Sequence, residues 1–138
     1  MCSTATAGDP QQALAAVRTL LSEALAQVED LTHDQCTALM QQLRAIGGKV
    51  DALTLAVVGK VDADGTYTLA GHLSARPWVQ EIAHQTPAQA ARTVRTARVL
   101  RSGLLPNTSA ALAAGAFTAG HAAVIVDGVK GAPAGRWR

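Results

Sequence analysis

The chain has 138 residues, of which 49% are hydrophobic, 16% are charged and only 3% are aromatic. This length suits one domain with its own core and is short for two, and the composition excludes an intrinsically disordered chain. Alanine supplies much of the apolar content and is the strongest helix former, so we expect an all-α protein.

The formal net charge of +2 is unevenly distributed along the chain. Residues 1–71 carry four basic and eight acidic side chains, whereas residues 72–138 carry eight basic and two acidic ones. A charge asymmetry of this kind hints at an anionic partner for the second half.

The location of the protein is predicted to be cytoplasmic. Cys2 and Cys36 form no CxxC pair and no disulfide framework, and the first residues lack the basic and apolar regions of a signal peptide. Residues 102–126 carry no formal charge and are long enough to span a bilayer. They are rich in alanine and contain Pro106 and Gly115, so we expect two helices there and no membrane contact.

The first half is predicted to be a long antiparallel helical hairpin, residues 9–61, after a disordered terminus at residues 1–8. Asp9-Pro10 is a helix-start signal, and the first helix is expected to end near Val28. Thr32 and Gln35 have capping-box spacing and begin a second helix, expected over residues 33–61. Its apolar residues alternate steps of three and four, as in a coiled coil: Cys36, Leu39, Leu43, Ile46, Val50, Leu53 and Val57. Gly47-Gly48 within it predicts a kink or a close crossing.

The second half is predicted to be a basic cluster of short helices, residues 74–127, which completes a single helical domain over residues 9–127. Asp62 to Gly65 is expected to be a turn, and residues 66–73 an irregular link. The predicted helices begin at caps Ser74 and Thr86, at about Thr108, and at cap Thr118. Residues 84–86 separate a helix-turn-helix-like pair, although the usual turn glycine is missing. The expected core residues are Trp78, Val79, Ile82, Ala90, Val94, Ala97, Leu100 and Leu104.

No catalytic residue, cofactor site or metal site is predicted. The sequence has no GxSxG, GxxxxGK[ST] or HExxH motif. The four histidines share no metal-ligand spacing with carboxylates or cysteines, and a structural hydrogen-bonding role is expected for His121. Asp62 and Asp64 resemble the opening of a calcium loop, but Gly65 comes too early and no distal glutamate follows.

Four arginines three residues apart are the candidate nucleic-acid-binding residues: Arg92, Arg95, Arg98 and Arg101. Two interpretations stay open. They form a solvated helix face, which is slightly favoured, or they contact neighbouring phosphates of a nucleic acid.

The order of motifs resembles the actinobacterial domain of unknown function family 222. The similar segments are "DADGTYTLAGHLSARPWVQEIA", "TPAQAARTVRTARVL" and "LPNTSAALAAGAFTAGHAAVIV", within residues 39–126. The matching signature residues are Asp64, Gly65, Ser74, Trp78, Pro106, Gly115 and His121, together with Ala91, Arg92, Arg95, Ala97, Leu105, Ala111, Leu112, Thr118, Ala122 and Ile125.

The resemblance implies a helical module that usually precedes an HNH endonuclease domain. This sequence contains no HNH motif, so nuclease activity is not expected of it, and residues 128–138 are expected to be an irregular, truncated or frameshifted tail. The leading hypothesis is a non-catalytic module that associates with DNA. The alternatives are self-association through the long helix, residues 36–57, or a remnant of a truncated HNH endonuclease gene.

Overall fold

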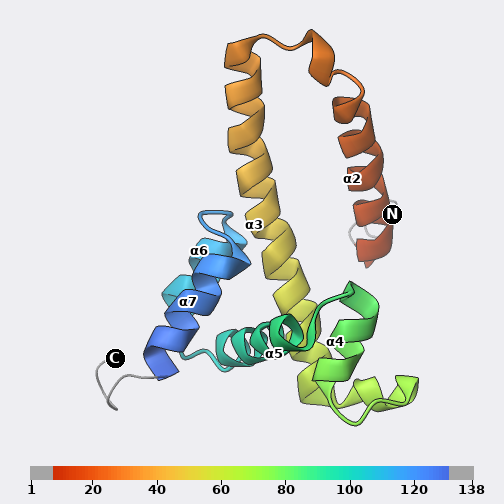
Figure 1. Ribbon diagram of the computed structural model, residues 1–138, viewed down its shortest axis with the longest axis vertical. Coiled ribbons are helices and arrows are strands. Elements are labelled where there is room, and N and C mark those ends of the chain that lie inside the picture. Colours follow the sequence, from red (N-terminus) through yellow and green to blue (C-terminus); the bar gives the residue numbers. More distant parts are fainter. Residues whose placement is uncertain (1–7, 131–138) are drawn as a thin grey trace. The chain divides into compact units, whose positions relative to one another are not determined.

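The computed structural model describes residues 8–130 and is helical throughout, with no strand in this part of the chain (Figure 1). The prediction of an all-α protein is therefore confirmed. The chain divides into two compact units, residues 1–40 and 41–138. The predicted division, a hairpin over residues 9–61 and a separate short-helix cluster, differs from this one. The boundary lies inside the longest helix because the later turns of that helix share their core with the short helices.

The first unit contains α2 (Pro10–Leu25), the 3₁₀ helix η1 (Val28–Asp30) and the first turns of α3 (His33–Asp64). Asp9 caps α2, since its Oδ1 accepts hydrogen bonds from the backbone N–H groups of the second and third residues of the helix at 3.0 and 3.4 Å. The helix ends three residues before the predicted Val28, where the backbone tightens into η1. The predicted antiparallel packing of α2 on α3 stays a prediction.

The capping box at the start of α3 is confirmed. The N–H of Thr32 donates to Oε1 of Gln35 at 2.9 Å, and the N–H of Gln35 donates to Oγ1 of Thr32 at 3.2 Å. The helix then runs three residues beyond the predicted Val61. It ends at Gly65, whose φ of 69° is the left-handed conformation that glycine adopts without strain.

The second unit packs the remaining helices around the later turns of α3. In chain order these are η2 (Thr66–Ala70), α4 (Ala75–Ala83), α5 (Pro87–Arg101), α6 (Pro106–Ala113) and α7 (Ala119–Lys130). Helix α5 is central, since α4, α6 and α7 all pack against it (Figure 1). Its own capping box, between Thr86 and Gln89, is formed as predicted.

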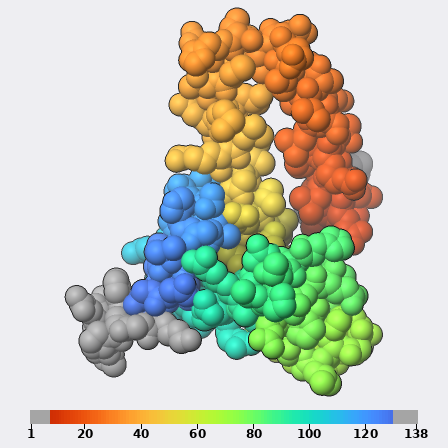
Figure 2. All heavy atoms as spheres, in the orientation of Figure 1, coloured from red at the N-terminus to blue at the C-terminus, as the bar shows by residue number. Residues whose placement is uncertain are grey.

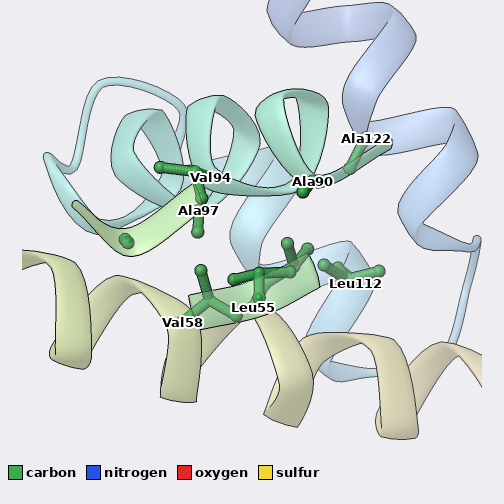
Figure 3. Close-up of a cluster of buried hydrophobic side chains, with 9 residues drawn as sticks. Leu55, Val58, Ala90, Val94, Ala97, Leu112 and Ala122 are labelled. Atoms are coloured by element: carbon green, nitrogen blue, oxygen red, sulfur yellow. The ribbon is translucent and has the colours of Figure 1, made fainter. Parts of the chain in front are cut away.

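The core lies where α5 crosses α3. Leu55 and Val58 of α3 point toward Val94 of α5, and α6 and α7 contribute further apolar side chains (Figure 3). Most of the buried side chains are small, so the helix backbones approach closely. The buried members of this cluster are Leu55, Val58, Ala75, Val79, Ala90, Val94, Ala97, Leu112 and Ala122.

The close approach of α3 to the α6–α7 loop requires two glycines. A Cβ at Gly48 would lie 2.8 Å from Cα of Gly115 and 2.9 Å from the carbonyl oxygen of Phe117. A Cβ at Gly115 would lie 2.5 Å from the carbonyl oxygen of Ala45. Gly48 is thus the predicted close crossing, whereas a Cβ at Gly47 would meet nothing within 4 Å.

Several predicted boundaries and core positions are wrong. Residues 66–73 are not wholly irregular, because η2 lies within them. Helix α6 begins at Pro106, a position that proline favours, rather than at about Thr108. Ile82 and Leu104 are exposed rather than buried, and the core instead takes in Thr96.

The end of the predicted domain also needs correction. Residues 128–130 are not an irregular tail, since α7 continues through Lys130 rather than ending near Val126. The remainder of the predicted tail, residues 131–138, lies outside the described residues, as do residues 1–7 of the predicted disordered terminus.

Candidate functional site

The arginine face of α5, defined as Arg92, Arg95, Arg98 and Arg101, contacts neighbouring helices of the second unit. Arg98 forms two hydrogen bonds with Asp62 of α3, from Nε to Oδ2 at 2.9 Å and from Nη2 to Oδ1 at 2.8 Å. This bidentate arrangement matches the planar guanidinium to the carboxylate and is the strongest geometry for such a pair. The Asp62 side chain is only 15% exposed, while that of Arg98 is 66% exposed.

Two further arginines share one carboxylate on α7. Nη2 of Arg95 donates to Oδ1 of Asp127 at 2.9 Å, and Nη2 of Arg92 lies 3.6 Å from Oδ2 of the same residue. The side chains of all three residues remain partly exposed. The three ion pairs therefore link α5 to α3 on one side and to α7 on the other.

Arg101, at the end of α5, differs from the other three. It is exposed and packs along Gly59 of α3, where a Cβ would lie 3.4 Å from its Cδ. Its charge contributes to a lowered pKa of Asp64, although the hydrogen bond from Lys60 is the larger cause. Both interpretations of the arginines therefore stay open, and the structure adds that Arg92, Arg95 and Arg98 are paired with carboxylates while partly exposed.

The Arg98–Asp62 pair changes the pKa of both partners. The hydrogen bond from Arg98 lowers the pKa of Asp62 below its ordinary value, and the positive charge adds to this effect, while partial burial opposes it. The hydrogen bond to Asp62 raises the pKa of Arg98 in turn. Both groups are therefore charged at neutral pH.

The sequence pattern does not reveal the two carboxylate partners. Asp62 falls in a segment whose composition predicts a turn, and no motif in the sequence points to Asp127. Asp127 could have been noticed, because it is one of only two acidic residues in the basic half of the chain. Its pairing with arginines 32 and 35 residues away could not be derived from local spacing.

A second candidate surface is the α3 stripe, defined as Leu43, Ile46, Val50, Leu53 and Val57. Helix α3 has two apolar faces. One face, with Leu55 and Val58, is buried against α5 and α6, whereas every residue of the stripe is between 37% and 48% exposed. Figure 2 shows the blue α6–α7 pair lying against the yellow part of α3. Apolar side chains at this spacing ordinarily meet another helix.

The signature residues have structural positions in the second unit. Gly65 and Gly115 both have positive φ, at 69° and 79°, and Pro106 opens α6. Nδ1 of His121 accepts a hydrogen bond from the N–H of Thr118 at 3.3 Å, so the expected structural role of His121 is confirmed.

Two predicted caps differ from the structure. Ser74 precedes α4, but its side chain makes no capping hydrogen bond. The first N–H of α7, that of Ala119, donates to Oδ2 of Asp51 on α3 at 2.8 Å, whereas the hydroxyl of the predicted cap, Thr118, lies 3.1 Å from Nδ1 of His121. The remaining signature residues lie at the end of α3 and on α4: Asp64, which pairs with Lys60, and the partly buried Trp78.

No family model matches the chain, and no curated protein or solved structure is significantly similar to it. The resemblance to family 222 therefore stays a prediction carried by the residues quoted above. Among residues 8–130, no group of three or more histidine, cysteine, aspartate or glutamate side chains could hold a metal ion. None of the helices described here is both long and apolar enough to cross a membrane.

Proposed function

We propose that the chain is a helical module of the kind that the family 222 resemblance implies, and that it acts by association rather than by catalysis. The partner that the geometry supports best is a second copy of the chain, bound through the α3 stripe. The observation that carries this proposal is the second apolar face of α3, which the other helices of its unit leave exposed. Contiguous exposed apolar patches of this kind mark interaction surfaces.

The margins of the α3 stripe favour a like partner. The residues that flank it include Gln42, Gly47, Thr54 and Ala56, which are uncharged. Two charged neighbours have partners of their own: Nζ of Lys49 donates to the carbonyl oxygen of Ala113 on α6 at 3.3 Å, and Nζ of Lys60 pairs with Oδ2 of Asp64 at 2.8 Å. Two stripes can therefore approach each other without like-charge repulsion.

The spacing of the stripe also suits a two-fold axis. Leu43 and Val57 each lie seven residues from Val50. In an antiparallel pair of α3 helices with the axis at Val50, Leu43 of each copy would therefore face Val57 of the other. The five residues form a small surface compared with the ~800 Å² per partner of a stable dimer. We therefore expect a weak dimer, with a dissociation constant on the order of 10–100 µM.

Sedimentation velocity over a range of concentrations tests this proposal. The wild-type chain should shift from monomer to dimer as its concentration rises. Val50→Glu should remain monomeric, because two carboxylates would face each other at the two-fold axis. Gln41→Glu is the matched control, since it adds the same charge about 180° around the helix from Val50.

Either of two results would contradict self-association through the stripe. One is a chain that is monomeric at every accessible concentration. The other is a dimer that Val50→Glu leaves unchanged while circular dichroism shows the same helix content for both proteins.

A second candidate function is association with DNA through the arginine face. Residues 72–138 carry a net charge of +6, and the side chains of Arg92, Arg95 and Arg98 are between 37% and 66% exposed. Exposed ion pairs contribute only about 0–1 kcal/mol each, so phosphate oxygens can compete with the carboxylates for these guanidinium groups. Binding of this kind would fall steeply with salt.

Fluorescence anisotropy with a labelled DNA duplex at about 50 and 200 mM salt tests this candidate. Replacing Arg92, Arg95 and Arg98 with alanine should weaken binding and flatten its salt dependence. Asp127→Asn should strengthen binding, because it frees two guanidinium groups. Asp34→Asn is the control, because it removes one negative charge outside the arginine face. If the arginines serve only to hold the helices together, Asp127→Asn and Asp34→Asn will raise the affinity for DNA by the same amount.

A further inference from the structure

A cavity of about 390 Å³ opens beside α5 in the second unit. His84 and Gln85 of the loop before α5, with Gln89 and Arg92 of α5 itself, line one side of it, and Leu55 of α3 lies against its apolar part. Its volume falls within the roughly 300–1,000 Å³ of small-molecule sites. The cavity is separate from the α3 stripe, and of the arginine face it includes only Arg92.

The two glutamines offer hydrogen-bond donors to this cavity. Oε1 of Gln85 accepts a hydrogen bond from the hydroxyl of Thr93 at 2.9 Å. Oε1 of Gln89 accepts one from the N–H of Thr86 at 3.0 Å, as part of the capping box of α5. Because both side-chain oxygens are engaged, the groups left for a ligand are the two NH₂ groups.

Arg92 adds a positively charged group to the same wall. At 3.6 Å, the contact of Arg92 with Asp127 is the longest of the three arginine ion pairs. The guanidinium group therefore retains N–H donors for a ligand. Ala119 and Gly120, the first residues of α7, also line the cavity, and the carboxylate of Asp51 already accepts the N–H of Ala119 at this helix start.

No aspartate or glutamate lines the cavity, and the carboxylates on neighbouring elements are engaged. Asp51 accepts a hydrogen bond from the N–H of Ala119, and Asp127 accepts one from Arg95. Thr96, which also lines the cavity, is only 2% exposed, and its hydroxyl has no hydrogen-bond partner among residues 8–130. Buried polar groups without a partner are rare in proteins and point to a missing group.

We infer that this cavity binds a small anion. Its carboxylate or phosphate group would accept hydrogen bonds from Gln85, Gln89 and Arg92. Its apolar body would lie against Leu55 and the alanines of the wall, Ala83 and Ala123. The polar side chains that line the cavity thus favour a charged ligand group, and the apolar side chains favour a compact hydrophobic body on the same ligand.

Isothermal titration of the full chain with three probes tests the inference: phenyl phosphate, benzoate and benzyl alcohol. At least one of the two anions should bind saturably, and the neutral alcohol should bind at least about tenfold more weakly, because it lacks the charge that the donors recognise. Binding of both anions would indicate a general oxyanion site, and binding of one alone would identify its class.

Gln89→Glu is the decisive variant. Glutamate serves as well as glutamine in a capping box, so the helix start is retained, but the donor is replaced by a negative charge. Affinity for the anion should fall at least about tenfold. Gln35→Glu is the control, since it makes the same change in the α3 capping box, which does not line the cavity, and should leave the affinity unchanged.

Three results would overturn the inference. The first is the absence of saturable binding by either anion to the wild-type chain. The second is equal binding of benzyl alcohol, which would indicate a non-selective apolar hollow. The third is an equal effect of Gln89→Glu and Gln35→Glu, which would show that the anion responds to net charge rather than to this cavity.

Discussion

Arg98 of α5 and Asp62 of α3, 36 residues apart in the sequence, are joined by two hydrogen bonds of 2.9 and 2.8 Å. The pair lies at the edge of the core that the two helices share. Arginines of α5 therefore stabilise its contacts with α3 and α7. Any ligand that binds these arginines would also affect the stability of the second unit.

Asp62→Asn should lower the free energy of unfolding of the second unit by about 1 kcal/mol. This is the upper end of the range for surface pairs, which fits a bidentate pair whose arginine is largely exposed. Urea unfolding followed by circular dichroism measures the change. Asp64→Asn, which removes the exposed pair with Lys60, should change stability by less than Asp62→Asn does. Equal effects of the two variants would contradict the special role of Asp62.

The stabilisation by Asp62 should depend on pH in a defined direction. Its pKa in the folded protein is below the ordinary value, so its contribution is present above the unfolded pKa of about 3.9 and is lost as the pH falls through the folded pKa. The difference in unfolding free energy between wild type and Asp62→Asn should be constant above about pH 5 and should shrink as the pH falls below the unfolded pKa and through the lower folded one. A difference that grows as the pH falls would contradict a lowered pKa of Asp62 in the folded protein.

Gly115→Ala should destabilise the second unit by about 3 kcal/mol or more. The residue has a φ of 79°, and the added Cβ would lie 2.5 Å from the carbonyl oxygen of Ala45. Gly103→Ala separates the two causes, because Gly103 has the same φ but open space around it. Gly103→Ala should lower the free energy of unfolding by only about 1 kcal/mol. Thermal melts of the two variants measure the difference between them.

Asp51→Ala should destabilise the second unit by about 1–2 kcal/mol, because it leaves the first N–H of α7 without its acceptor. Asp9→Ala removes an equivalent cap from α2, which buries no side chain. We expect Asp9→Ala to reduce helix content slightly and to leave the main unfolding transition in place. Unfolding followed by NMR distinguishes the effects on the two units.

His84→Gly should stabilise the protein by about 0.5–1 kcal/mol, although it removes a side chain. His84 has a φ of 53° and is the one non-glycine residue between 8 and 130 with a positive φ. Glycine adopts this conformation without strain, and the gain is partly offset by its greater freedom in the unfolded chain. His84→Ala keeps the strain, so a melting temperature raised equally by alanine and glycine would contradict this explanation.

The sequence by itself determined where the helices begin and what fold class they form. The capping boxes at Thr32 and Thr86, and the cap at Asp9, are made by residues two or three positions apart. Interactions at such short range are largely independent of the rest of the molecule, so local patterns predict them.

Only the tertiary structure decided which groups from distant segments meet. The arginines were recognised as a set, but their partners Asp62 and Asp127 come from other helices, as does Asp51 at the start of α7. The sequence showed that α3 is apolar, yet not that one of its faces would be buried and the other left exposed. These outcomes depend on how whole helices pack together, and the hydrophobic effect that drives packing is non-directional, so no local pattern encodes its result.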